Sequence, residues 1–171
     1  MVYNNLFSGI SCLLLAVSIS ACAQGKKSTA RKSGGKYAKL IAAAKQEHLP
    51  GAPGMEPTVN YMFVIIWNKA TPPESFFWRG ADGWMPCMVS KAKYTPNAAN
   101  NGFPFDRAPI KLKRFERGDT LMIVPAKRAK DVMPESISAD TRNTLFFKTA
   151  GTSWLALPVD NIKELPKEIG Q

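Results

Sequence analysis

The segment 58–67, TVNYMFVIIW, is the feature that most limits what this chain can fold into. It is dominated by β-branched and aromatic residues, which favour extended backbone. Its centre, Met62 to Trp67, is apolar at successive positions, so a strand here would be apolar on both faces. Such a strand belongs inside a sheet, with other parts of the chain covering it on each side. The sequence therefore predicts a layered fold organised around this strand.

Shorter segments of the same character follow, and turn residues separate them. They predict further strands over 74–79, 84–93, 110–115, 120–124, 143–149 and 154–159. With about seven short strands joined mostly by hairpin-like connections, the sequence predicts an all-β protein, a mainly antiparallel β-sandwich.

Two details of the predicted hairpin can be checked directly. Asp82-Gly83 lies between two aromatic-rich segments, and a two-residue turn at these positions would bring Trp78 opposite Cys87. Pro86 has no backbone N–H to donate to a neighbouring strand, so we expect an edge strand or a bulge there.

The segment 36–49, KYAKLIAAAKQEHL, has a different pattern. Apolar residues recur at helical spacing, and Ala, Lys, Gln and Glu favour a helix. The Pro and Gly residues of 50–54 would end it. We therefore expect a short N-terminal helix and linker over 37–54, followed by the β-sandwich domain over 55–171.

The N-terminal segment 6–22, LFSGISCLLLAVSISAC, resembles the signal peptide of a bacterial lipoprotein. Its apolar part, 6–19, is shorter than the ~20 residues of a membrane-spanning helix and suits a secretory signal. Ile19-Ser20-Ala21-Cys22 matches the lipoprotein processing box: a branched apolar residue, two small residues and a cysteine. The resemblance covers only this leader, and it departs from the usual pattern in having no Lys or Arg in residues 1–5.

The resemblance implies that residues 1–21 are removed and that Cys22 carries the lipid that anchors the chain in a bilayer. In lipoproteins the residue after this cysteine affects sorting, and Ala23 is not the aspartate linked to inner-membrane retention. Lys26 and Lys27 stand where acidic residues mark surface export in some groups. The implied location is the outer membrane, facing the periplasm.

Residues 22–36 are Gly/Ser-rich and basic, which is typical of a flexible tether. This composition weighs against the structural alternative, a buried helix or strand over 13–19. The tether holds five of the 23 basic residues and no acidic residue, so half of the net charge of +10 lies on it. Anionic headgroups attract such segments. Nucleic acid is the other usual partner of basic tails, but an exported lipoprotein rarely meets it, so we expect none.

The sequence gives little support for catalysis. With Cys12 removed and Cys22 acylated, Cys87 has no disulfide partner and is expected to be a small buried hydrophobe. His48 is the only histidine and is far from Cys87 in the chain, so no nucleophile–base pair is indicated. No pair of acidic residues or nucleotide-binding glycine motif stands out. We expect no catalytic residues and no cofactor.

Soft ligands for Cu(I) occur together at Met85, Cys87 and Met88. On a strand, however, Met88 points to the face opposite Met85 and Cys87. Core packing is therefore the expected role of these residues, and we expect no metal site.

Aromatic residues are dense around the predicted hairpin, and a β-sandwich core would use most of them. The candidates for an exposed binding patch flank the turn: Trp78, Arg79 and Trp84. Basic residues are frequent between 91 and 130, with Lys111 and Lys113 on one face of a predicted strand. They predict a solvated sheet face or, alternatively, a patch for anionic headgroups, polysaccharide or an acidic partner.

These features together predict a membrane-anchored lipoprotein. Its expected role is that of a non-catalytic binding or structural component of a cell-envelope assembly, with another envelope protein as partner. The alternative is a carbohydrate- or peptidoglycan-binding module that uses the aromatic hairpin. A third reading, an enzyme, is weakened by the single, poorly placed histidine.

Overall fold

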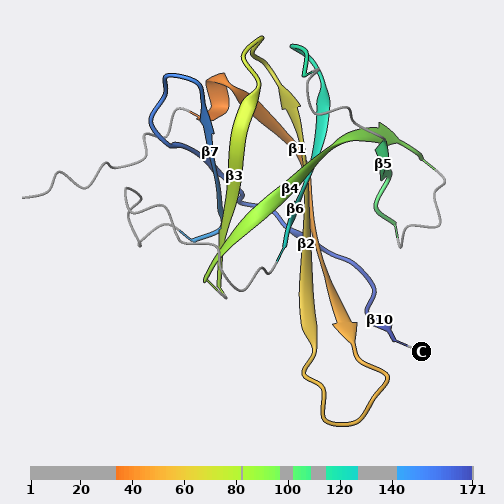
Figure 1. The fold of residues 1–171 in the computed structure, drawn as a ribbon. Helices are drawn as coiled ribbons and strands as arrows, with labels where there is room; N and C mark the ends of the chain where they lie inside the picture. Colours follow the sequence, from red (N-terminus) through yellow and green to blue (C-terminus); the bar gives the residue numbers. More distant parts are fainter. Residues whose placement is uncertain (1–33, 82, 97–101, 109–114, 127–141, 171) are drawn as a thin grey trace, which may run out of the picture.

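A computed structural model describes residues 34–81, 83–96, 102–108, 115–126 and 142–170. These residues are almost entirely β-structure (Figure 1). The elements are the 3-10 turn η1 (Gly34–Lys36) and the strands β1 (Ala38–Leu49), β2 (Thr58–Trp67), β3 (Pro73–Gly80), β4 (Gly83–Tyr94), β5 (Phe105–Ala108), β6 (Thr120–Pro125), β7 (Thr144–Thr149), β8 (Leu155–Pro158), β9 (Lys163–Glu164) and β10 (Glu168–Ile169). The prediction of an all-β protein is confirmed.

The strands form one curled, mixed sheet in place of the two packed sheets of the predicted sandwich. The strand order is β10-β1-β2-β6-β4-β3-β7-β8, and β5 and β9 pair with β4 and β1. Neighbouring strands are antiparallel, except that β9 and β10 run parallel to β1. The chain curls because β4 changes partners along its length: residues 83–86 pair with β3, and residues 87–91 pair with β6 on the other edge.

The helix predicted over residues 37–49 is wrong, because this segment is strand β1. It pairs with β2 from Ala38, opposite Trp67, to His48, opposite Thr58. Local propensity is outweighed by this long ladder on a strongly β-forming neighbour. A bulge between Leu40 and Ala42 breaks the alternation of side chains. Residues 37–49 thus belong to the sheet and not to a linker.

Strand β2 is covered on both faces, as its sequence predicts. Phe63, Ile65 and Trp67 lie in the main core, together with residues of β3, β6, β7 and β8. Val64 points the other way and packs in a second cluster. That cluster includes Phe103, which precedes β5, and Leu165 of the C-terminal segment, so short peripheral pieces cover the outer face of β2.

The β3–β4 hairpin turns one position earlier than predicted. Gly80 pairs with Gly83, and Trp78 therefore lies opposite Met85 and not opposite Cys87. The edge position expected for Pro86 is also wrong. Pro86 sits where β4 leaves β3 and begins to pair with β6, so its missing N–H falls at a change of partner, and its carbonyl accepts from Ala126 N at 2.8 Å.

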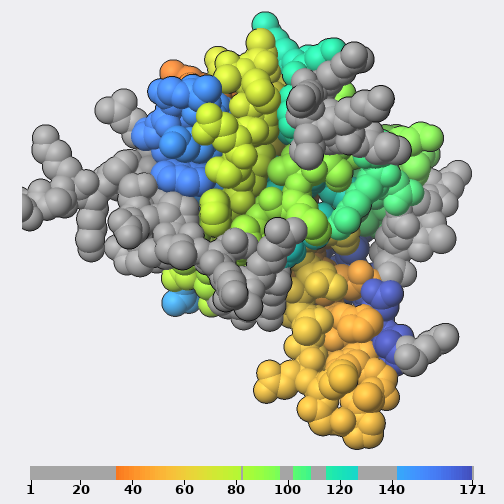
Figure 2. All heavy atoms as spheres, in the orientation of Figure 1, coloured from red at the N-terminus to blue at the C-terminus, as the bar shows by residue number. Residues whose placement is uncertain are grey.

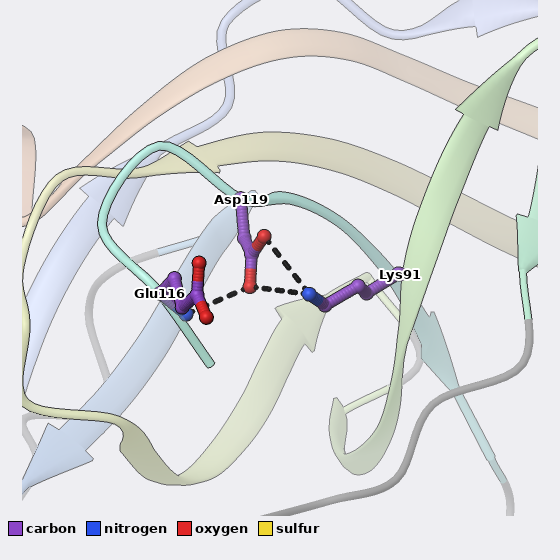
Figure 3. A network of polar contacts seen from close by, with 3 residues as sticks. All are labelled: Lys91, Glu116 and Asp119. Carbon is purple, nitrogen blue, oxygen red and sulfur yellow. Dashed lines mark hydrogen bonds and ion pairs between the residues drawn. The ribbon is translucent and has the colours of Figure 1, made fainter. Parts of the chain in front are cut away.

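A small polar network fixes the turn that precedes β6, residues 116–119 (Figure 3). The Asp119 carboxylate accepts from the backbone N–H of Glu116 at 2.8 Å and from Lys91 Nζ at 3.0 Å. Gly118 N–H donates to the Trp67 carbonyl at 2.6 Å. The turn before β6 is thereby attached to both β4 and β2.

Several predictions fall outside the described residues: the leader with Cys22, the predicted tether up to residue 33, and Lys111 and Lys113. The last three residues of the predicted tether are described and form η1, in which Gly34 is buried. The predicted strand 110–115 is also largely outside the described residues, whereas β5 lies in a segment for which no strand is predicted. In the parts of the chain that the structure describes, no helix has the length and apolar character that crossing a membrane requires.

Candidate functional site

The outer face of the β3–β4–β7–β8 region carries a group of aromatic residues and one arginine. We call it the outer aromatic cluster and define it as Phe77, Arg79, Trp84, Phe146 and Trp154. The register brings them together, since Phe77 pairs with Phe146 and Arg79 pairs with Trp84. Trp84 lies against Phe146 with ring centroids 5.0 Å apart, and Phe77 meets Trp154 edge-on at 5.4 Å.

Phe146 is fully buried, whereas Phe77, Trp84 and Trp154 are half-buried. The cluster is thus a second, smaller apolar layer on the side of the sheet opposite the main core. Its half-buried rings leave aromatic surface next to solvent, which is the character of a protein-binding patch.

Arg79 lies over this layer. Its guanidinium carbon is 5.4 Å from the centroid of the Trp84 ring, a cation–π contact. Its Nε is buried and has no hydrogen-bond partner among the described residues. The guanidinium thus keeps unused hydrogen-bonding capacity beside the aromatic ring, which a carboxylate or carbonyl of a partner could satisfy.

The exposure predicted for Trp78 is wrong. Its side chain is 0% exposed and packs at 4.5 Å from Phe63 and 5.3 Å from Tyr61, measured between ring centroids. Alternation along β3 explains this, because Trp78 points into the main core while Phe77 and Arg79 point outward. Of the three predicted binding residues, Arg79 and Trp84 are brought together on the surface and Trp78 is separated from them.

Trp78 has one unusual feature inside the core. Its indole Nε1 is buried and finds no hydrogen-bond partner in the part of the chain that the structure describes. A Cβ atom at Gly80 would lie 2.5 Å from that nitrogen, so only glycine fits beside the ring.

Sequence reasoning missed Phe146 and Trp154. Phe77 could have been found, because alternation puts it on the same strand face as Arg79. Phe146 and Trp154 carry no local signal of this kind. They join the cluster because β7 pairs with β3, and the order of strands in a sheet is not written in any one segment.

The second candidate surface is the projecting end of the β1–β2 hairpin, residues 45–61, which we call the arm (Figures 1 and 2). The C-terminal segment, residues 163–170, runs along its β1 edge. Leu165 N–H donates to the Lys45 carbonyl at 2.9 Å, and Gly170 N–H donates to the Leu49 carbonyl at 2.8 Å. The segment therefore covers much of an edge that would otherwise be open to pairing with another chain.

Charged side chains also join the arm to the C-terminal segment. Lys45 pairs with Glu164, and Lys167 Nζ lies 2.8 Å from a Glu47 carboxylate oxygen. The hydrogen bond and charge of Lys45 lower the pKa of Glu164, and Glu164 in turn raises the pKa of Lys45. A hollow of about 170 Å³ lies between the two segments, but the lysines and glutamates that line it are largely engaged with one another. This surface offers little free charge to a ligand.

The residues with catalytic potential are not brought together. His48 lies on the arm, 3.8 Å from Glu168, whereas Cys87 lies in the body of the sheet opposite Pro125. Cys87 is half-buried, and burial raises the pKa of its thiol. A hollow of about 180 Å³ beside it is lined by Phe76, Val89 and Phe115 together with Pro73, Glu74 and Ser75. No nucleophile–base pair is formed by these two residues.

The sulfur ligands of β4 are not brought together either. Met85 is buried in the core and Met88 is 45% exposed, so the two point to opposite faces of β4, as predicted. Among the described residues, no three His, Cys, Asp or Glu side chains gather in a way that could hold a metal ion.

Comparison with known proteins gives no match: no protein-family model, no curated protein and no solved structure resembles this chain significantly.

Proposed function

We propose that this protein is a bacterial lipoprotein, anchored through Cys22, that acts as a non-catalytic binding component of a cell-envelope assembly. The leader ending in Ile19-Ser20-Ala21-Cys22 and the basic tether after it support the anchoring. By the same resemblance the protein belongs to the outer membrane and faces the periplasm.

The outer aromatic cluster is the observation that carries the binding role. Tryptophan and arginine are the residues most enriched at the energetic centres of protein interfaces, and here they occur as a contacting pair. Arg79 and Trp84 lie beside the β3–β4 turn. Arg79 is about 20 Å from Pro73, at the start of β3, by the usual rise per strand residue. The proposed partner is an envelope protein that presents an apolar surface with an acidic group for Arg79.

A glycan-binding module is the second candidate, because half-buried rings also suit sugars. Stacking of a sugar needs a free ring face, however, and Arg79 already lies over Trp84. Trp84 and Trp154 are the half-buried tryptophans, whereas Trp67 and Trp78 are fully buried. Titration with peptidoglycan fragments should therefore leave tryptophan fluorescence unchanged. A saturable change that disappears in Trp84→Phe would favour the glycan-binding role instead.

The anchor is tested with Cys22→Ala. We expect this variant to leave the membrane fraction and to lose metabolic labelling with fatty acid, since the acyl chains provide the attachment. A wild-type protein that carries no fatty acid, with a variant that remains on the membrane, would show that the leader has been misread.

The binding role is tested by crosslinking in cells. A photo-reactive residue is placed at Ala81, which is exposed in the β3–β4 turn, and as a control at Lys93, which is exposed at the other end of β4. We expect Ala81 to capture one reproducible envelope protein, and Arg79→Glu to abolish the capture because it repels the acidic group. Equal capture from both positions would contradict a specific site at the cluster.

A further inference from the structure

One end of the sheet gathers positively charged residues from four separate parts of the chain. We call it the basic end and define it as Lys36, Lys39, Lys69, Arg117 and Lys148. Asn68 N–H donates to the Tyr37 carbonyl at 2.7 Å, and Gly118 N–H donates to the Trp67 carbonyl at 2.6 Å. These bonds bring η1, the β2–β3 connection and the turn before β6 to the same end (top of Figure 1), where β7 also ends after Lys148.

The charges of the basic end are not neutralised within the described chain. The ion pairs of the described residues have Lys45, His48, Lys91 and Lys167 as their basic partners. None of these pairs involves a residue of the basic end. Lys36, Lys39 and Arg117 are exposed, and Lys69 lies over the Tyr37 ring at 5.1 Å.

Acidic residues at this end offset only part of the charge. Glu74 and Glu116 are exposed there, while Asp119 is already paired with Lys91 (Figure 3). The remaining positive charge therefore faces solvent.

The opposite end of the molecule has a different charge balance. The arm and the C-terminal segment together carry four glutamates and three lysines: Glu47, Glu56, Glu164 and Glu168, and Lys45, Lys163 and Lys167. Two of these lysines are ion-paired with glutamates of the same surface. Among the described residues, positive charge thus exceeds negative charge at the basic end and is largely balanced on the arm.

We propose that the basic end rests on the anionic headgroups of the lipid surface in which the protein is anchored. The proposal rests on the proposed function, because acylation of Cys22 is what brings the domain to a membrane. Eleven residues separate Cys22 from Gly34, where the described chain begins. Twelve virtual bonds reach at most about 40 Å, so an acylated Cys22 keeps Gly34 within that distance of the lipid surface.

This short tether keeps the basic end at high effective concentration next to the headgroups. The sequence between Cys22 and the domain also carries Lys26, Lys27, Arg31 and Lys32, which add to the attraction of the chain for anionic headgroups. Contact at the basic end also directs the β3–β4 turn and the arm away from the bilayer, toward a partner.

The test compares two triple variants with equal loss of charge in the mature chain, residues 22–171, carrying Cys22→Ala, which lacks both the leader and the acyl anchor. The first is Lys36→Gln, Lys69→Gln and Arg117→Gln. The control is Arg107→Gln, Arg142→Gln and Lys163→Gln, three exposed positions outside the basic end, of which Lys163 lies beside the arm. Binding is measured by sedimentation with vesicles of phosphatidylglycerol and phosphatidylcholine, and with vesicles of phosphatidylcholine alone.

Each basic residue near an anionic surface contributes about fivefold to binding, so the first variant should bind the anionic vesicles at least about tenfold more weakly than the control. We expect all forms to bind neutral vesicles weakly and the difference to shrink in high salt. Equal losses in both variants, or no loss in either, would overturn the proposal. Circular dichroism verifies that both variants are folded.

Failure of the lipid-surface proposal is distinguishable from failure of the proposed function. The first appears as equal vesicle binding of the two variants. The second appears as a wild-type protein that is not labelled by fatty acid, whatever its vesicle binding.

Discussion

Two tryptophans in the main core provide a sharp test of how this core is built. Trp67 and Trp78 are both 0% exposed. Trp67 Nε1 donates to the Thr71 carbonyl at 2.9 Å, whereas Trp78 Nε1 has no partner. Substitution by phenylalanine removes the same atoms at both positions, so the difference between the two variants isolates the effect of the hydrogen bond.

The expected magnitudes follow from these contacts. Replacing the indole by the smaller phenyl ring costs about 2 kcal/mol at either site, taking ~0.8 kcal/mol per buried carbon group. Trp67→Phe also loses a hydrogen bond, a further ~1 kcal/mol, which gives a total of about 3 kcal/mol. Trp78→Phe removes a buried donor that nothing satisfies and recovers ~1–2 kcal/mol, so its net cost is about 0–1 kcal/mol. We expect Trp67→Phe to be the more destabilising by about 2–3 kcal/mol.

Urea unfolding followed by far-UV circular dichroism measures this difference, since the signal does not depend on the tryptophans that are replaced. The midpoints should separate while the dependence of the free energy on urea stays the same. If the two variants lose equal stability, within about 0.5 kcal/mol, then Trp78 Nε1 has a hydrogen-bond partner and the reasoning is refuted.

Three further predictions follow from single contacts. Gly80→Ala should destabilise the protein by about 1–3 kcal/mol because its Cβ would lie 2.5 Å from Trp78 Nε1, whereas Gly35→Ala, with nothing within 4 Å, should have little effect in the same urea assay. Pairing with Lys45 lowers the pKa of Glu164. The pairing should therefore stabilise the C-terminal segment fully at any pH above the ordinary carboxyl pKa, and this stabilisation should be lost as the pH falls through the lowered pKa. Exchange of the Leu165 amide hydrogen, corrected for its intrinsic rate, should therefore speed up in acid; the same acid response in Glu164→Gln would contradict this. Burial raises the pKa of the Cys87 thiol, so in the Cys22→Ala protein a disulfide reagent at pH 8 should react at least about tenfold more slowly before unfolding than after it; equal rates would show an accessible thiolate.

The β-character of the chain could be predicted from local sequence, because the residues of β2, β3, β6, β7 and β8 have strong strand preferences. The helix predicted over 37–49 also relied on local sequence, and there the prediction was wrong. Its alanines and charged residues favour a helix locally, but β2 offers this segment a ladder along its whole length. Pairing between strands is a non-local contact, and a propensity assigned to one segment does not contain it.

The candidate site, too, could be predicted only in part from local sequence. Arg79 and Trp84 could be selected from the sequence because both flank one turn. Trp78 was placed on the wrong face because the sequence shows alternation but not which face is buried. Phe146 and Trp154 reached the outer aromatic cluster only through the pairing of β7 with β3.

The sequence by itself determined the β-rich composition, the central and doubly covered position of 58–67, and the resemblance of the leader to a lipoprotein signal. Each of these depends on side chains that are neighbours in the chain. The tertiary structure alone decided the strand order, the single curled sheet, the burial of Trp78 and the gathering of basic residues at one end. These depend on β4 changing partners at Pro86 and on turns distant in sequence that meet at one end of the sheet, because the pairing energy is shared between segments that are far apart in the chain.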